Sequence, residues 1–207
     1  MPALNSPQDV LAHELKAIDS AERQLSRALP RIMKKLSSDQ LREMLEKRLE
    51  QGATLMEEID GVLEELEAPK ARPRNAAAEG LIAQATDLLE EAQEKSLVDP
   101  LVLGSVQKLE HYCIAAWGTA AALARMLEQK KAAKAMERAL KEGKRLDDKL
   151  TELAESEINP TMMKGTGEAE EGEEKAEGEA QRRGRSGGSR RRTSGRSGAS
   201  ARSGKAR

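Results

Sequence analysis

The chain has 207 residues, which is enough for one folded domain with an appendage. Aromatic residues make up 1% of it, with one Trp, one Tyr and no Phe, whereas sandwiches and barrels depend on aromatic and β-branched side chains. Good helix formers such as Ala, Leu, Glu and Lys are abundant instead. The composition therefore argues against an all-β protein and predicts an all-α one.

The net charge of −1 is unevenly distributed along the chain. Residues 165–207 carry seven acids and eleven Lys or Arg, so this segment has a charge of +4 and the remainder has −5. No apolar run approaches the ~20 residues of a membrane helix, and the first ten residues lack the basic and apolar regions of a secretory signal. Cys113 is the only cysteine, so no disulfide can form within the chain. We therefore expect a cytoplasmic protein that does not contact a membrane.

Apolar residues recur every three or four positions in five stretches, which is the spacing of a helix face that packs on a core. The first stretch opens at Ser6 and Pro7, a capping residue followed by a proline, and Pro30 is expected to kink it. The five expected helices cover residues 6–36, 37–68, 76–95, 99–129 and 131–156.

Four of the expected helices are long and apolar on one side, and the shorter helix over 76–95 lies in the connection between the second and fourth. A long crossover in the middle of a four-helix bundle is typical of ferritin-like proteins. The sequence therefore predicts a ferritin-like four-helix bundle with an extra short helix in the crossover.

Helical periodicity stops after residue 164. Residues 168–179 are mostly Glu with Gly and Ala, and residues 182–207 are rich in Arg, Ser and Gly. Neither block can bury enough apolar surface to offset the entropy lost on ordering. We predict a bundle domain over 1–164 and a disordered tail over 165–207.

Four charged residues fall on the apolar stripes near the middle of their helices: Glu22, Arg48, Glu110 and Asp147. A buried carboxylate is costly unless it takes a proton or a partner. Carboxylates that meet in a bundle core hold the two cations of di-iron and di-manganese proteins. Glu22, Glu110 and Asp147 are therefore the candidate metal ligands. The alternative is that each acid lies at the edge of its stripe and reaches water.

Several blocks of the sequence resemble, in order and spacing, the YciE/YciF-type ferritin-like stress proteins, a bacterial family of poorly defined function. The blocks are HELK at 13–16, SAERQL at 20–25, GLI at 80–82, QKLEHY at 107–112, WGT at 117–119 and the segment 147–153. The resemblance covers about residues 6–156 and does not extend to the tail. It implies a ferritin-like bundle, commonly a homodimer, with a di-metal site.

The chain departs from the family pattern where that metal site would lie. It has Asp19 where the family has Tyr, and Arg48 where the family has His. At four further positions the family has Glu and this chain does not; they are Gln51, Gln84, Cys113 and Gly143. A cage of this kind needs about four carboxylates and two imidazoles, and a thiol is a soft ligand poorly matched to them.

Arg48 brings a fixed positive charge to the place where cations would bind. Its planar guanidinium can bridge the carboxylates of Glu22 and Glu110. We therefore hypothesise that an internal salt-bridge cluster has replaced the metals.

Two functions of the bundle stay open on the sequence alone. In the first, the chain is a stress-response protein that is non-catalytic or binds metal weakly, without a tightly held cofactor. In the second, it is a di-iron or di-manganese oxidase or ferroxidase with an altered ligand set. Oxidation of added Fe(II) distinguishes the two.

The basic part of the tail suggests a further function. Its arginines include the run Arg190, Arg191 and Arg192, and such segments bind DNA or RNA by neutralising phosphates. No aromatic residue lies among them to stack on bases, so this binding would be non-specific. The alternative is a solubilising tail whose acidic block pairs loosely with its basic block.

Overall fold

The computed structural model describes residues 4–69 and 71–165, and no strand occurs among them. The all-α prediction is confirmed, as is the order of five helices. They are α1 (Pro7–Met33), α2 (Asp39–Glu65), α3 (Ala76–Glu91), α4 (Val98–Met126) and α5 (Lys130–Leu153), with a 3₁₀ turn at Lys95–Leu97 and a π-helical turn at Ala154–Ile158. All of the tail predicted over 165–207 except its first residue lies outside the described residues.

The predicted helix ends differ from the observed ones by a few residues. The third helix was expected to reach residue 95, but α3 ends at Glu91 and is followed by a separate turn. Pro30 lies inside α1, which continues to Met33. None of the described helices is long and apolar enough to cross a membrane.

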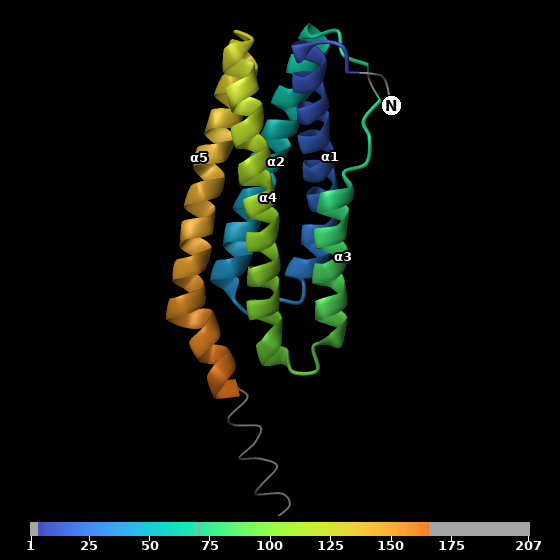
Figure 1. The fold of residues 1–207 in the computed structure, drawn as a ribbon. Helices are drawn as coiled ribbons and strands as arrows, with labels where there is room; N and C mark the ends of the chain where they lie inside the picture. The colour runs from blue at the N-terminus through green and yellow to red at the C-terminus, as the bar shows by residue number, and fades with distance from the viewer. Residues whose placement is uncertain (1–3, 70, 166–207) are drawn as a thin grey trace, which may run out of the picture. The chain divides into compact units, whose positions relative to one another are not determined.

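The four long helices form a bundle, with α3 on its outside (Figure 1). α1 packs against α2 and α4, and α5 packs against α4 and α2, which closes the ring of four. α2 and α4 run in the same direction, because the linker 66–75 and α3 bring the chain back along the bundle between them (Figure 1). α3 packs against α1 and α4.

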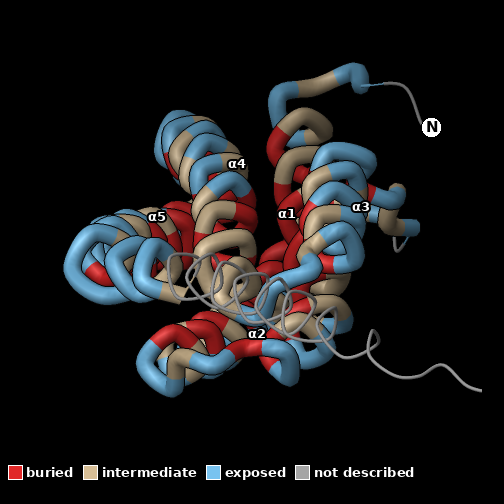
Figure 2. Tube along the Cα trace, turned by 90° about the horizontal axis from the view of Figure 1, so that it is seen from below, coloured by how far each residue is buried: buried red, intermediate tan, exposed pale blue. Residues whose placement is uncertain are grey.

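The core lies between the helices, where their buried sides face one another (Figure 2). Leucines at three- and four-residue spacings fill much of it, and burial of each leucine contributes roughly 1.5–3 kcal/mol. Small side chains near the α4–α5 turn allow these two helices to approach closely; they are Ala120, Ala121, Ala124, Ala132, Ala133 and Ala135, all buried.

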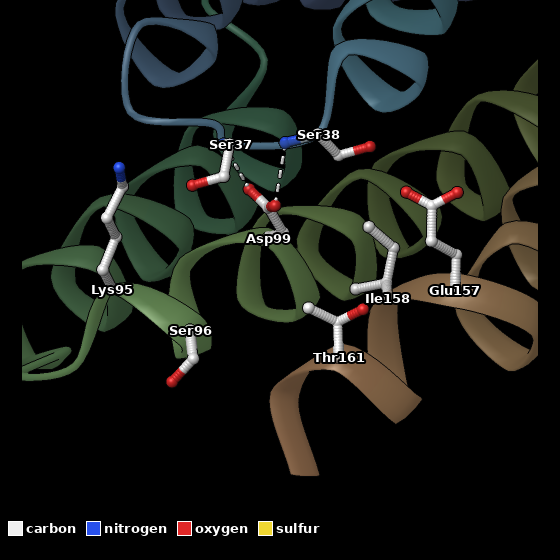
Figure 3. Close-up of a pocket in the computed structure, with 8 residues that line it drawn as sticks. All are labelled: Ser37, Ser38, Lys95, Ser96, Asp99, Glu157, Ile158 and Thr161. Carbon is white, nitrogen blue, oxygen red and sulfur yellow. Dashed lines mark hydrogen bonds between the residues drawn. The ribbon is translucent and has the colours of Figure 1, made fainter. Parts of the chain in front are cut away.

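Polar caps fix where the helices begin. The side chains of Ser6, Ser38 and Asn75 each accept a backbone N–H three residues further on, at the starts of α1, α2 and α3. Asp99 at the start of α4 also holds the α1–α2 turn (Figure 3). Its carboxylate oxygens accept the backbone N–H groups of Ser37 and Ser38, both at 2.9 Å.

Asn75 fastens the crossover to the bundle. Its side-chain amide donates to the carbonyl of Ala17 at 2.9 Å and to the hydroxyl of Tyr112 at 2.6 Å. Its backbone N–H donates to Ser20 Oγ at 3.0 Å. The start of α3 is therefore bonded to both α1 and α4.

Candidate functional site

Three charged side chains from three helices meet in the core of the bundle. Glu22 of α1, Arg48 of α2 and Glu110 of α4 are each at most 3% exposed. Nη1 and Nη2 of Arg48 donate to Oε2 and Oε1 of Glu22 at 2.9 and 2.8 Å. Nε of Arg48 donates to Oε1 of Glu110. We call these three residues the Arg48 cluster.

An indole ring and a thiol complete the surroundings of the guanidinium. The ring of Trp117 has its centroid 5.3 Å from Cζ of Arg48, within the range of a cation–π contact. Sγ of Cys113 lies 4.0 Å from Nη2 of Arg48. Both residues come from α4, one and two turns beyond Glu110.

Two glycines make the room that these side chains occupy. A Cβ atom at Gly52 would lie 2.6 Å from Oε2 of Glu22, and one at Gly143 would lie 2.4 Å from Cζ3 of Trp117. Real Cβ atoms do not approach other atoms so closely, so any larger residue would displace Glu22 or Trp117. The sequence pattern did not indicate this role for either glycine.

Burial and charge act in opposite directions on the pKa values of the Arg48 cluster. Burial alone would lower the pKa of Arg48, but the charges of Glu22 and Glu110 raise it well above its ordinary value, so the guanidinium stays charged. Burial raises the pKa of Glu110, and the charge of Arg48 offsets this only in part. Oε2 of Glu110 accepts no hydrogen bond from the described part of the chain.

The residues present do not fit a two-cation site. The guanidinium of Arg48 stands between the two core carboxylates and bonds both of them. Burial, followed by the charge of Glu22, raises the pKa of the Cys113 thiol well above its usual value, which disfavours the thiolate form at this position. Within residues 4–69 and 71–165, no group of three His, Cys, Asp or Glu side chains is placed to hold a metal ion.

Asp147 of α5 lies at the edge of the bundle. Its side chain is 20% exposed, and its Oδ2 lies 2.9 Å from Nε2 of the exposed His111. Gln107 donates to its other oxygen at 3.3 Å. The structure therefore brings Glu22 and Glu110 together and leaves Asp147 in a pair with His111, although its charge still adds to the rise in the Glu110 pKa.

A second ion-pair group lies where the crossover linker passes α1 and α2. Asp19 is fully buried, and its Oδ2 lies 2.9 Å from Nε of Arg23 and 2.7 Å from Nε of Arg72. Both arginines also pair with Asp60 of α2. Apart from the exchange of the family's Tyr for Asp19, no sequence pattern indicated this group. The linker has no helical periodicity, so its path past α1 could not be predicted.

The predicted nucleic-acid residues Arg190, Arg191 and Arg192 lie outside the described residues.

Comparison with known proteins places this architecture in a family. The family described as "Domain of unknown function (DUF892)" matches residues 6–163. The chain is 38% identical over 153 residues to Protein YciF of Escherichia coli K12. The aligned residues cover 73% of this chain and 92% of YciF. The crystal structure of the E. coli stress protein YciF is similar with a TM-score of 0.70 and 37% identity, over 75% of this chain and 99% of that one. The structure of YcfI from Rhodopseudomonas palustris has a TM-score of 0.67 and 29% identity, over 71% and 94% of the two chains. The chain therefore belongs to the DUF892 family and is YciF-like, as the resemblance of its sequence blocks predicted.

Proposed function

We propose that this chain is a non-catalytic, cytoplasmic stress-response protein of the ferritin-like type, in which an ion-pair cluster takes the place of a di-metal centre. The observation that carries the proposal is the guanidinium of Arg48, which bonds the carboxylates of both Glu22 and Glu110 in the core. The description of the E. coli relative YciF as a stress protein supports the same class of function.

The chemistry of the Arg48 cluster supports a structural role. Di-metal oxidases need open coordination positions for oxygen or substrate. Here, the positive charge belongs to the covalently attached side chain of Arg48 and not to an exchangeable metal ion. Its planar guanidinium binds a carboxylate through two N–H groups in one orientation. A bidentate pair of this kind fixes the orientation of α1 relative to α2. The hydrogen bond from Arg48 to Glu110 links α4 to the same pair.

Oxygen consumption after addition of Fe(II) tests the proposal against a ferroxidase or oxidase. We expect the protein to consume oxygen at the rate of buffer that contains Fe(II) alone. The variant Arg48→His/Gln51→Glu/Cys113→Glu restores three residues of the family pattern and serves as the comparison. Multiple turnovers of Fe(II) oxidation by the natural chain would overturn the proposal.

We propose a second function for the tail, which is non-specific binding of DNA or RNA. Residues 182–207 hold ten Lys or Arg and no acid, which supports binding through phosphates. In a gel-shift experiment at low salt, the full chain should retard nucleic acid and a chain without residues 181–207 should not. The full-length variant Arg190→Gln/Arg191→Gln/Arg192→Gln should bind with a weaker dependence on salt. The slope of the logarithm of the binding constant against the logarithm of the salt concentration should fall in magnitude by about 0.9 for each phosphate that is no longer neutralised. Equal shifts for all three proteins would mean that the tail only aids solubility.

We also propose that the chain forms a homodimer, as the family resemblance implies. Sedimentation equilibrium measures the mass directly, and twice the chain mass of 22.6 kDa is expected. A single-chain mass at micromolar concentration would contradict a stable dimer.

A further inference from the structure

Positive charge in the bundle domain is concentrated on α5. This helix carries eight Lys or Arg and five Asp or Glu, which is a net charge of +3. The other residues of 1–164 carry 16 Lys or Arg and 24 Asp or Glu, which is a net charge of −8. A polyanion is therefore attracted to α5 and repelled by the rest of the bundle.

Five cations of α5 form one exposed line, which we call the α5 ridge. With about 3.6 residues in each turn they fall within an arc of about 100°, and with a rise of about 1.5 Å per residue they extend over about 22 Å. They lie on the outer side of α5, which faces away from the core (Figure 2). The members of the ridge are Lys130, Lys134, Lys141, Lys144 and Arg145, and all are exposed.

The acids beside the ridge contact bases that do not belong to it. These contacts are Glu137 with Arg125 at 2.7 Å, Glu142 with Arg138 at 3.9 Å and Asp147 with His111 at 2.9 Å. Asp148 and Glu152 lie beyond the ridge, toward the end of α5. No member of the ridge forms an ion pair with the residues that the structure describes. Its five charges are therefore available to a partner.

The side chains of α5 favour a phosphate backbone over a protein partner. Protein interfaces depend on apolar and aromatic anchors, and the exposed large apolar side chains of the described residues lie outside α5, at Leu4, Met126 and Met163. Phosphates require only positive charge. Single strands are bound largely by stacking on aromatic rings, and α5 has none. Duplex RNA is contacted over about 16 base pairs, which is more than a ridge of this length spans.

We infer that the α5 ridge binds the phosphate backbone of duplex DNA. At ~3.4 Å for each base pair, the ridge spans about six base pairs. Contacts to phosphates carry no sequence information, so binding is independent of sequence. The ridge belongs to the bundle domain, and the inference does not rest on nucleic-acid binding by the tail.

Fluorescence anisotropy of the full chain with a DNA duplex of about 20 base pairs, at several salt concentrations, tests the inference. The variant Lys134→Gln/Lys141→Gln/Arg145→Gln removes three charges of the ridge. Its binding at low salt should be weaker by about ten-fold or more, and the slope against the logarithm of the salt concentration should fall in magnitude by up to about 2.7. The control Lys34→Gln/Lys35→Gln/Lys47→Gln removes three exposed lysines elsewhere and should bind close to the natural chain. All of these side chains are exposed, so both variants should fold, which circular dichroism checks.

The same ridge substitutions in the full-length variant Arg190→Gln/Arg191→Gln/Arg192→Gln separate the ridge from the tail. We expect them to weaken DNA binding further in that background. A ridge variant that binds like the natural chain would overturn the inference, and a loss confined to the tail variant would leave the proposal for the tail standing.

Three other results would also overturn the inference. Equal losses in the ridge variant and its control would show that binding depends on net charge alone. Tighter binding of an RNA duplex of the same length would contradict the assignment to DNA. A natural chain that binds poly-glutamate and no DNA duplex would have an acidic protein as its partner.

Discussion

The carboxylate of Glu22 on α1 accepts two hydrogen bonds, at 2.9 and 2.8 Å, from the guanidinium of Arg48 on α2. The same guanidinium donates to Glu110 on α4, so one side chain joins three of the four long helices. All three residues are buried, and their bonds are therefore not shared with bulk water. Arg48 therefore links α1, α2 and α4 through buried bonds.

Removal of Arg48 should destabilise the protein severely. Arg48→Ala leaves two carboxylates in the core without their cation, and the loss of one partner of a buried pair typically costs about 3–5 kcal/mol. Urea denaturation followed by circular dichroism measures the change. The matched control is Arg125→Ala, which breaks the exposed pair with Glu137 and should cost less than about 1 kcal/mol. Similar losses for the two variants would show that Arg48 is not buried as described.

Neutralising the whole Arg48 cluster should recover much of that loss. In Arg48→Met/Glu22→Gln/Glu110→Gln, no charge remains in the core, and replacement of a complete buried ion cluster is often close to neutral. The free energy of unfolding of the triple variant should therefore exceed that of Arg48→Ala. A triple variant as unstable as Arg48→Ala would show that uncompensated charge is not the cause of the loss.

Gly143 should not tolerate alanine, although alanine usually favours a helix. Its added Cβ would lie 2.4 Å from Trp117 and 3.3 Å from Oε2 of Glu110, and overpacking of a filled core typically costs about 1–3 kcal/mol. Gly118 provides the control, because a Cβ there meets nothing within 4 Å. Gly118→Ala should stabilise the protein by roughly 0.5–1 kcal/mol. Melting temperatures that move in the same direction for both variants would contradict the packing described around Trp117.

Stability should depend on pH through Glu110. Burial raises its pKa in the folded chain above the ordinary value of 4.5, so the folded chain takes up this proton at a higher pH than the unfolded chain. The contribution of Glu110 to the free energy of unfolding therefore rises as the pH falls from neutral towards that ordinary value. Denaturation of the natural chain and of Glu110→Gln between pH 7 and about pH 5 measures it. The difference between them should grow in favour of the natural chain as the pH falls, and parallel curves would contradict the raised pKa.

The sequence was sufficient for the helices and for part of the candidate site. Spacings of three and four residues identified the inward faces, and Glu22, Arg48 and Glu110 are indeed buried there. Asp147 falls on a similar stripe but is only half-buried. The sequence could not show this, because periodicity gives the direction of a side chain around the helix axis and not how closely neighbouring helices pack over it.

The interactions of the linker could not be predicted in the same way. Arg72 binds Asp19 from an irregular segment, and its position depends on the three-dimensional path between α2 and α3. This pairing follows from tertiary packing around α1.

Metal content per chain tests the central claim most directly. Purified protein would be incubated with Fe(II) or Mn(II) under anaerobic conditions, dialysed and analysed by inductively coupled plasma mass spectrometry, beside the variant Arg48→His/Gln51→Glu/Cys113→Glu. If Arg48 has taken the place of the cations, the natural chain retains no stoichiometric metal and the variant gains some. Two tightly held iron or manganese ions in each natural chain would contradict the account.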